Sequence, residues 1–409
     1  SLGKSAGADL VEIFLEKSDN ISLLAEQDDI SNVSPSFGIG AGIRVFLGKK
    51  DGFVSTNDLS NSGLLFALNQ ALRMLGLVTA TNNNRFEGLR DLNDFAIKKN
   101  DWLDHSPCLN ESTSKLLQAT RLLAEKNKNL QVRRASYSRN WQEVLIAASD
   151  GVFARDIRLH QTVGLNVIAQ KDKNRSISAR RLGSSGNPDD LRNWVIEKTA
   201  SELNESAQKM LYASYVEAGQ MPVVLANKFG GVIFHEACGH LLETTQLERG
   251  TSPFHDSINK QIAHKAVSAV DEGLSNHAFG SLSMDDEGME PQNTLLIDNG
   301  ILKRFLSDRA GELRTGHPRT GSGRRQNFSF ASASRMRNTY IKKGNYTPKE
   351  LIETVDNGLY CKSMGGGSVG PTGQFNFSVE EGYLIKNGKL DKPVKGATLI
   401  GEAKEILPR

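Results

Sequence analysis

Cysteine is scarce in this chain of 409 residues, which holds only Cys108, Cys238 and Cys361. So few cysteines in so long a chain argue against a disulfide scaffold and fit a reducing compartment, so we expect a cytoplasmic protein. No apolar run reaches the length of a membrane-spanning helix, and residues 1–4 lack the apolar core of a signal peptide. The net charge of only +3 does not indicate a strongly basic surface. We therefore expect no membrane insertion and no direct nucleic-acid binding.

The first hundred residues show short alternations of apolar and polar residues, followed by one amphipathic pattern. The alternations predict strands at residues 8–16, 21–26, 43–47 and 53–56, and a stripe of leucines predicts a helix over residues 60–75. Residues 38–42 are rich in glycine, as phosphate-binding loops are, but a strand rather than a helix follows them. We interpret these glycines as a bulge or a close strand contact, and residues 1–100 as a small α/β domain.

Residues 101–215 repeat this plan and form a second predicted α/β domain. Residues 163–171 align without a gap with residues 41–49, and each segment is followed by a polar turn, a short strand and a helix, the second helix at residues 188–211. Between these repeats we expect a helix and three antiparallel strands, at residues 112–125, 131–137, 142–147 and 152–159. The shared order predicts a divergent internal duplication.

The remaining residues, 216–409, contain two hairpin signals. Asn299-Gly300 and Asn387-Gly388 each separate two apolar runs. Asn-Gly is the strongest short hairpin signal because both turn residues need positive φ. We therefore expect a C-terminal domain built as a mainly antiparallel β-sheet or barrel. Together with the α/β N-terminal half, this predicts an α+β fold class.

The C-terminal domain begins with the motif on which our functional hypothesis depends. A buried strand at residues 222–226 is expected to lead into a helix that carries His235, Glu236 and His240. The histidines are five residues apart, in H-E-x-x-x-H, whereas zinc hydrolases usually have them four apart. Five residues of an ideal helix turn through about 500°, so the two rings would diverge by roughly 140°. Binding one ion therefore requires a bulge or break between Glu236 and His240, which Gly239 is well placed to permit.

The residue types in this motif indicate metal-assisted hydrolysis. Neutral imidazoles bind Zn²⁺, and a neighbouring glutamate can accept a proton from water, so His235 and His240 are candidate ligands and Glu236 is the candidate general base. The alternative is a partly buried helix with two unrelated histidines. Glu243 is open to three interpretations: third ligand, hydrogen-bond partner of His240, or solvated residue. Three further histidines lack ligand spacing and are not expected to bind metal: His255, His264 and His277.

Residues 235–252, HEACGHLLETTQLERGTS, are accompanied by further matching segments at residues 52–59, 283–288, 323–326, 335–340, 365–367 and 395–401. Together these segments, which span most of the chain, resemble the TldD/PmbA family, also called the modulator of DNA gyrase family. The His-Glu motif is similar to that of the TldD branch and is generally lacking in the PmbA (TldE) branch. The resemblance implies a zinc metallopeptidase with one Zn²⁺ per active subunit, acting on small or unfolded peptides. It also implies a dimer, with a PmbA-type partner or with a second copy.

The third zinc ligand of TldD-type proteins is a Cys in a Gly-x-Cys motif that follows the segment equivalent to residues 395–401. No such motif follows that segment up to Arg409, and Cys361 lies in a different context, Gly358-Leu359-Tyr360-Cys361. From the resemblance we expect the third ligand to come from a C-terminal tail outside this sequence.

Arginines and glycines near the motif are candidate substrate contacts. Arg324 and Arg325 belong to a cluster of arginines between residues 314 and 337, which can hold a peptide carboxylate, pair with the acidic turn at residues 285–288, or be solvated. We favour pairing or solvation for most of the cluster, and a solvated or Arg-paired acidic turn. Gly366, in a run of three glycines, could let a substrate backbone come close.

In the expected mechanism, Zn²⁺ activates a water molecule while Glu236 accepts its proton and returns it to the leaving amine. Two alternative functions belong to other classes of protein. One is a non-catalytic regulator of gyrase or another partner, although a structural zinc site would not need Glu236. The other is a zinc hydrolase of a small-molecule amide, for which a closed pocket rather than a peptide-length cleft is expected.

Overall fold

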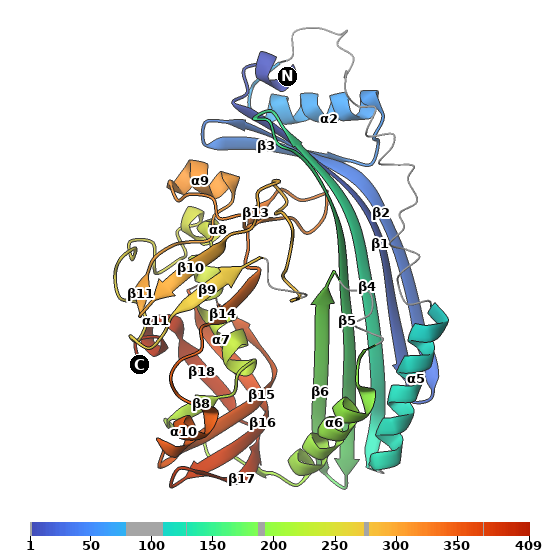
Figure 1. The fold of residues 1–409 in the computed structure, drawn as a ribbon, viewed down its shortest axis with the longest axis vertical. Coiled ribbons are helices and arrows are strands. Elements are labelled where there is room, and N and C mark those ends of the chain that lie inside the picture. Colours follow the sequence, from blue (N-terminus) through green and yellow to red (C-terminus); the bar gives the residue numbers. More distant parts are fainter. Residues whose placement is uncertain (1, 79–108, 128, 187–192, 274–277, 371) are drawn as a thin grey trace.

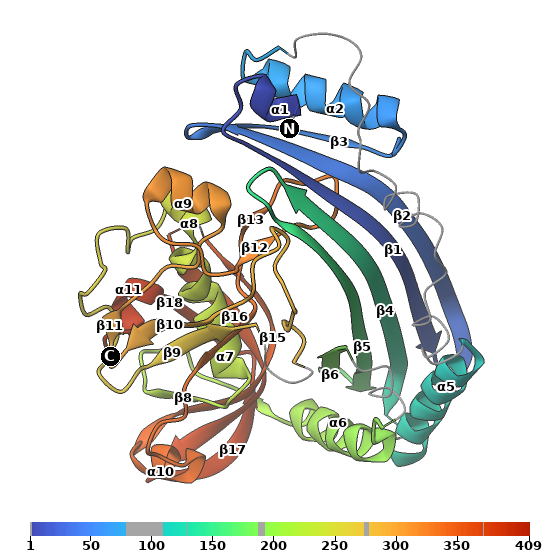
Figure 2. The ribbon, with the colours of Figure 1, turned by 45° about the horizontal axis from the view of Figure 1, so that its top comes forward.

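The computed structural model describes residues 2–78, 109–127, 129–186, 193–273, 278–370 and 372–409. Its N-terminal half is one long, strongly curved sheet, and its C-terminal half lies on the concave side of that sheet (Figure 1). The view in Figure 2 shows the same arch from another side, with α2 at one end and α5 and α6 at the other.

The N-terminal sheet is antiparallel throughout and has the order β3-β2-β1-β4-β5-β6. Its strands are β1 (Leu10–Glu26), β2 (Asp29–Leu47), β3 (Lys50–Thr56), β4 (Leu130–Ala148), β5 (Phe153–Lys171) and β6 (Asn174–Ser185). The glycine-rich residues 38–42 lie within β2, so the prediction of a strand rather than a phosphate loop is confirmed. The two predicted N-terminal domains thus share one sheet.

Several strands that were predicted as separate pieces are continuous. Residues 8–16 and 21–26 belong to one strand, β1, because the polar residues between them find partners on β4. Asp19 forms an ion pair with Arg139 at 2.6 Å, and Asn20 lies opposite Asn140. Cross-strand pairs of this kind stabilise a sheet where no apolar face is buried. The same continuity joins the predicted strand pieces into β4 and β5.

Four helices accompany this sheet: α1 (Leu2–Ser5), α2 (Asn61–Met74), α5 (Leu109–Lys126) and α6 (Ile196–Leu211). The predicted leucine stripe of α2 is confirmed, since Leu64, Leu68 and Leu72 are buried in a core with β1 and β2. Ser60 accepts a hydrogen bond from the Gly63 N–H and caps this helix. The predicted helix at 188–211 begins only at Ile196, and its residues 188–192 lie outside the described part of the chain.

The sheet is symmetric about the β1–β4 pair. The aligned segments 41–49 and 163–171 fall on β2 and β5, each of which is second from an edge, and each is followed by an edge strand and then by a helix. This is the arrangement that an internal duplication would produce. The duplication, and the domain boundaries at residues 100 and 215, stay predictions.

The C-terminal half contains three smaller sheets and no closed barrel among the described strands. A six-stranded sheet comprises β7 (Ser214–Tyr215), β8 (Val223–Leu225), β15 (Asn357–Val369), β16 (Gln374–Lys386), β17 (Lys389–Lys395) and β18 (Thr398–Glu402). The four-stranded sheet comprises β9 (Ala269–Glu272), β10 (Asn293–Asp298), β11 (Ile301–Leu302) and β14 (Asn338–Ile341), and β12 (Gly323–Arg324) pairs with β13 (Ala333–Ser334). Most pairs are antiparallel, which confirms the α+β fold class.

Both predicted hairpins of this half are confirmed. Asn299 and Gly300 join β10 to β11 with φ of 48° and 82°, and Asn387 and Gly388 join β16 to β17 with φ of 49° and 70°. Positive φ at both residues matches the strand twist of two-residue hairpins. The short helices of this half are α7 (Phe229–Ala237), the 3-10 helix η2 (Gly239–Leu242), α8 (Thr244–Glu248), α9 (Arg309–Thr315), α10 (Pro348–Glu353) and α11 (Ala403–Ile406).

Buried ion pairs join the two halves of the molecule. Arg325 and Glu12 form a fully buried pair, and Arg158 on β5 pairs with Asp286. Phe14 and Met284 belong to a small apolar cluster at the same junction. Breaking a buried pair leaves an uncompensated charge, which costs far more than losing a surface pair. These contacts therefore fix the C-terminal half against the concave side of the sheet.

Candidate active site

The candidate metal helix α7 begins at an unusual turn. The preceding strand, β8, is confirmed, but it is not buried as predicted, since Val223 is 39% exposed at the edge of its sheet. Lys228, the residue before α7, has φ 72° and ψ −63°. These angles are those of a γ-turn with positive φ, which is rare and strained for an L residue. The chain therefore reverses sharply into α7 at a lysine, where a glycine would be the ordinary choice.

The predicted break in the motif is confirmed. The α-helical conformation ends at Ala237, Cys238 adopts φ −121° and ψ −52°, and a 3-10 helix begins at Gly239. The rings of His235 and His240 consequently meet, with their centroids 4.8 Å apart and their planes at 83°. A regular helix would have turned them roughly 140° apart.

Gly239 has a role in packing. A Cβ atom there would lie 2.2 Å from the Sδ atom of Met336, which is closer than van der Waals contact permits. The close approach of Met336 and the residues around it holds the broken end of the motif in place.

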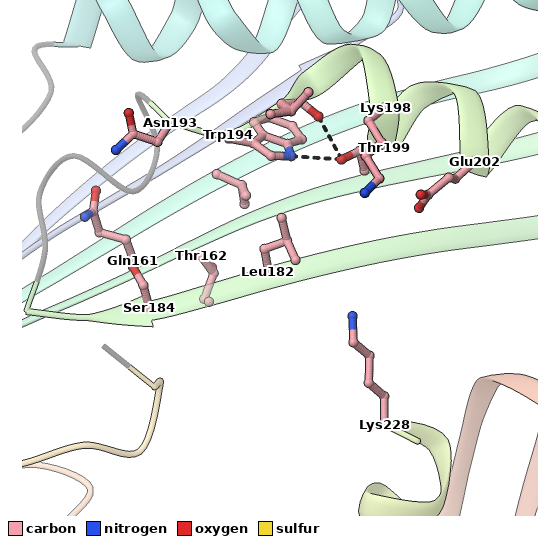
Figure 3. A pocket seen from close by; sticks show the side chains of 13 residues that line it. Gln161, Thr162, Leu182, Ser184, Asn193, Trp194, Lys198, Thr199, Glu202 and Lys228 are labelled. Atoms are coloured by element: carbon pink, nitrogen blue, oxygen red, sulfur yellow. Dashed lines mark hydrogen bonds between the residues drawn. The ribbon is translucent and has the colours of Figure 1, made fainter. Parts of the chain in front are cut away.

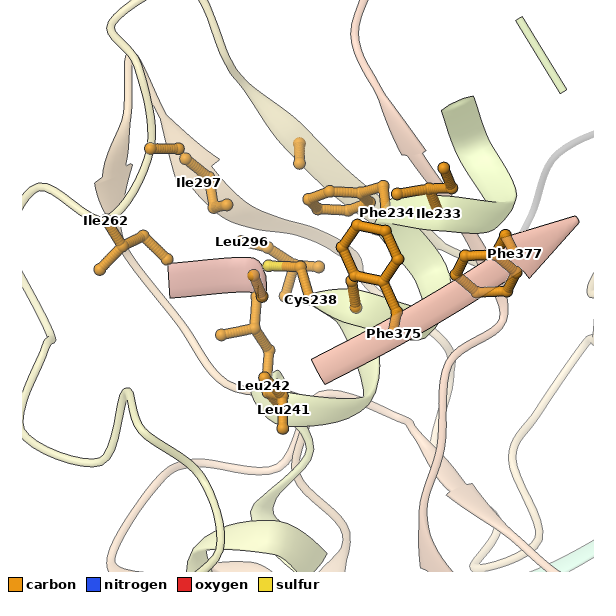
Figure 4. Close-up of a cluster of buried hydrophobic side chains, with 14 of the residues drawn as sticks. Ile233, Phe234, Cys238, Leu241, Leu242, Ile262, Leu296, Ile297, Phe375 and Phe377 are labelled. Carbon is orange, nitrogen blue, oxygen red and sulfur yellow. The ribbon is translucent and has the colours of Figure 1, made fainter. Parts of the chain in front are cut away.

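A large apolar core fixes the other face of α7. Ile233, Phe234 and Cys238 are buried against Phe375 and Phe377 of β16, as Figure 4 shows. Burial of side chains of this size contributes on the order of 2 kcal/mol each. The histidines therefore project from a well-packed scaffold. Burial also raises the pKa of the Cys238 thiol to about 12, so this cysteine stays protonated and inert.

A hydrogen-bonded chain orients His240. Its Nδ1 atom lies 3.0 Å from Oε1 of Glu243, and Oε2 of Glu243 accepts a hydrogen bond of 2.8 Å from Arg335. Glu243 is completely buried. Because Nδ1 is engaged, the free Nε2 of His240 points to Glu236, whose Oε2 lies 3.8 Å away. Of the three interpretations of Glu243, the geometry favours the hydrogen-bond partner of His240.

The pKa values of His235 and His240 are shifted in opposite directions. Burial, and then the neighbouring His240, lower the pKa of His235, which favours its neutral form. The hydrogen bond that His240 donates to Glu243 raises the pKa of His240 despite its partial burial. A carboxylate that holds the remote nitrogen of an imidazole is the usual support of a metal-binding histidine.

The cluster fits a metal ion. Ligand atoms of His235, Glu236 and His240 all lie within 4.8 Å of one another, and in the described part of the chain no other His, Cys, Asp or Glu group forms such a set. The side chains of Glu236 and His240 are each 37% exposed, so a substrate can reach them. Burial raises the pKa of Cys361 to about 12, and this residue is not part of the cluster.

Other predicted residues lie elsewhere. The prediction that Arg325 contacts a substrate is wrong, because its side chain is completely buried and paired with Glu12. Arg324 is exposed, and Gly366 has φ 136° within β15, so both stay predictions. His255 is exposed and pairs with Asp256. His277 lies outside the described residues.

The sequence predicts that the acidic turn at residues 285–288 is either solvated or paired with arginines. The structure confirms the pairing with arginines. Asp286 pairs with Arg158 and Glu287 pairs with Arg319, and both carboxylates are buried. Asp285 accepts hydrogen bonds from backbone N–H groups, including that of Gly323. This turn is thus part of the junction between the halves of the molecule.

Sequence reasoning missed a pocket of about 680 Å³ between the two halves. Strands β5 and β6 and the start of α6 line one side, and Lys228 reaches in from the start of α7 (Figure 3). A lysine at positive φ has no signature in the sequence, and the facing strands are about 50 residues or more distant. No local pattern could have brought these residues together.

Comparison with known proteins assigns the class and then the family. Residues 11–75, 107–211 and 218–409 match, in order, domain 1, the central domain and the C-terminal domain of PmbA/TldA metallopeptidases. The chain belongs to the TldD/PmbA metallopeptidase family. The metalloprotease TldD homologue of Haemophilus influenzae is 32% identical over 417 residues, which cover 98% of this chain and 84% of the relative. A zinc metalloprotease TldD homologue of Saccharolobus solfataricus is 35% identical over 207 residues, 50% of this chain and 46% of the relative.

Solved structures share the fold. TldE from Thermococcus kodakarensis superposes with a TM-score of 0.77 at 19% identity, covering 99% of this chain and 91% of its own. A putative modulator of a DNA gyrase from Thermotoga maritima gives a TM-score of 0.80 at 18% identity, covering 100% and 91%. In the described residues, none of the helices is both long enough and apolar enough to span a bilayer.

Proposed function

We propose that this protein is a zinc-dependent metallopeptidase that hydrolyses small or unfolded peptides. The observation that carries the proposal is the break after Ala237, which brings His235, Glu236 and His240 together although their spacing on a regular helix would separate them. The names of the relatives, among them a zinc metalloprotease, support the same reaction class.

The donor set suits zinc, which prefers imidazole and carboxylate ligands. His235 would bind through a neutral imidazole, and His240 through Nε2, because Glu243 engages Nδ1. The third ligand of TldD-type proteins is a cysteine, and neither of the two described cysteines, Cys238 and Cys361, belongs to the cluster. When bound, Zn²⁺ would polarise the scissile carbonyl and lower the pKa of a water molecule to about 7.

Glu236 is the proposed general base. Its side chain is 37% exposed, and its carboxylate lies 3.8 Å from His240 Nε2, beside the position where a metal-assisted reaction would occur. It accepts a proton from the attacking water as the C–O bond forms, and it delivers that proton to the departing amine nitrogen as the C–N bond breaks. Glu243 and Arg335 take no part in proton transfer in this mechanism. They hold the imidazole of His240 in one orientation and one tautomer.

The test compares the full-length protein with its Glu236→Gln variant, each alone and with a TldE-type partner. Zinc content is measured together with cleavage of an unfolded peptide. We expect the wild type to bind zinc and cleave, and the variant to keep zinc while kcat falls by at least 100-fold, the usual contribution of a general base. If both proteins hold zinc and neither cleaves, alone or with the partner, a regulator or a small-amide hydrolase becomes the better assignment. Size measurements on the mixtures show whether the protein pairs with itself or with the partner.

A further inference from the structure

The pocket between the halves has one apolar wall and one charged wall. Val163 and Leu182 from β5 and β6, together with Trp194, form the apolar part. Lys228 points across from the start of α7 toward these residues and toward Lys198 on α6 (Figure 3). The shape suits an extended side chain or chain end that is apolar along its length and charged at its tip.

The charge of the pocket is positive and centres on Lys228. Lys198 and Glu202 both line the pocket one helical turn apart on α6, so their charges largely offset each other. Lys228 is exposed, and no acidic group among the described residues lies within ion-pair distance of its ammonium group. The charges of the lining therefore favour a ligand that carries a negative charge.

The backbone of Lys228 gives a second, independent observation. Its φ of 72° is costly for any L side chain, and strain of this kind concentrates at functional sites. The Lys228 carbonyl accepts the Val232 N–H at 2.9 Å, and Gly230 donates to Ala226 at 2.9 Å, so the turn is tied down on both sides. Asparagine or glycine would tolerate this conformation better, but neither would bring a cation into the pocket.

The metal cluster is not itself part of the pocket lining, and Lys228, which is, lies directly before the helix that carries the cluster. Lys228 precedes α7, and His235 lies seven residues further on, which corresponds to roughly 10 Å along a helix axis. Gly231 lies between them in the first turn of α7, and no atom outside its own helix would come within 4 Å of a Cβ atom added there. An extended peptide covers about 10 Å with three residues.

We propose that the pocket is a substrate subsite that binds a carboxylate about three residues from the scissile bond, with Lys228 as the residue that determines this preference. The carboxylate is either the side chain of a glutamate or the C-terminus of the peptide. The inference rests on the proposed peptidase function. Its test therefore includes a binding measurement that needs no catalysis.

The binding test uses the Glu236→Gln protein loaded with zinc, alone and with the further change Lys228→Gln. Three fluorescent peptides of one sequence are compared: one with Glu three residues from the cleavage position, one with Gln there, and one with Gln there and an amidated C-terminus. We expect the Glu peptide, or the peptide with a free C-terminus, to bind about fivefold more tightly than its neutral counterpart at low salt. The preference should shrink in 0.5 M salt, and Lys228→Gln should abolish it.

The control is Lys349→Gln, which removes another exposed lysine, on α10, that is not part of the pocket lining. It should keep the wild-type preference. Equal binding of all three peptides to the Glu236→Gln protein would overturn the subsite. If the charge preference appears but the wild type cleaves none of the peptides, the subsite stands and the peptidase assignment fails. If the wild type cleaves the peptides but binding shows no charge preference, the peptidase assignment stands and the subsite fails.

A second variant tests the path between the pocket and the metal cluster. Gly231→Leu replaces glycine with a good helix former in α7 and fills the open space beside Gly231. Two peptides are compared, one long enough to reach the pocket and one that is two residues shorter. In Gly231→Leu we expect kcat/KM for the longer peptide, relative to kcat/KM for the shorter one, to fall about tenfold. An unchanged ratio, in a variant that binds zinc and melts like the wild type, would show that substrates do not run past Gly231.

Discussion

Replacing Glu243 with glutamine tests whether the buried carboxylate supports the metal site. In the wild type, Glu243 has two partners, the Nδ1 atom of His240 at 3.0 Å and the Arg335 guanidinium at 2.8 Å. A glutamine amide offers one oxygen and one NH₂ group. If its oxygen faces His240, its NH₂ group faces Arg335, and two donors then oppose each other. If its oxygen faces Arg335 instead, its NH₂ group can pair only with an unprotonated Nδ1, and that tautomer carries its proton on Nε2, the atom expected to bind metal. Either orientation therefore weakens metal binding.

Two independent arguments give the expected loss of zinc affinity in Glu243→Gln. A hydrogen bond to a charged group contributes about 1.5–3 kcal/mol when buried. Removing the hydrogen-bond partner of a metal-binding histidine typically weakens metal binding about 10- to 100-fold, which corresponds to about 1.4–2.8 kcal/mol. We expect the zinc Kd of Glu243→Gln to rise within that range.

The assay is competition for zinc between the full-length protein and a chromophoric chelator, with circular dichroism to confirm the fold. The matched control is Glu248→Gln on α8, because this carboxylate is also paired with an arginine, Arg314, but is not part of the metal cluster. We expect its zinc Kd to stay within about threefold of wild type. A folded Glu243→Gln protein that binds zinc as tightly as the wild type would refute the idea that Glu243 holds a ligand in place.

Neighbouring arginines should respond very differently, because Arg325 is buried with Glu12 and Arg324 is exposed. Arg325→Met should lower the free energy of unfolding by about 3 kcal/mol in urea titrations and Arg324→Met by less than about 0.5 kcal/mol, and equal effects would contradict the buried pair. Burial, and then repulsion by Glu287, raise the pKa of Asp308 to about 7. Because the folded state binds this proton more tightly than the unfolded state, the stability contributed by Asp308 declines as the pH rises from about 4 to 7. Asp308→Asn should therefore be more stable than wild type at pH 8 by on the order of 1 kcal/mol and gain nothing at pH 4, and a pH-independent difference between the melting temperatures would count against the raised pKa.

Features that depend on nearby residues could be predicted from the sequence. The leucine stripe of α2 and the Asn-Gly turns depend on residues within a few positions of one another. The break between Glu236 and His240 follows from helix geometry and the requirement that two ligands meet. In each case the physical cause is contained in the segment itself.

Features that depend on distant partners could not be predicted. The continuity of β1 through Asp19 needs Arg139, which lies 120 residues away in the sequence. The support of His240 by Arg335 spans a similar gap, and Arg325 could not be recognised as buried without Glu12 at the other end of the chain. A charged residue has the same appearance in a sequence whether it faces solvent, a substrate or an opposite charge.

The central position of β1 has a consequence for folding. One edge of this 17-residue strand pairs with β2 at once, but the other pairs with β4, whose residues come 120 positions later at Arg139. At a synthesis rate of about 5–20 residues per second, that edge stays unpaired for on the order of 10 s on the ribosome. Long unpaired edges invite pairing with other chains. Nascent chains of this protein are therefore most prone to aggregate, and in greatest need of a chaperone, before residue 148 emerges.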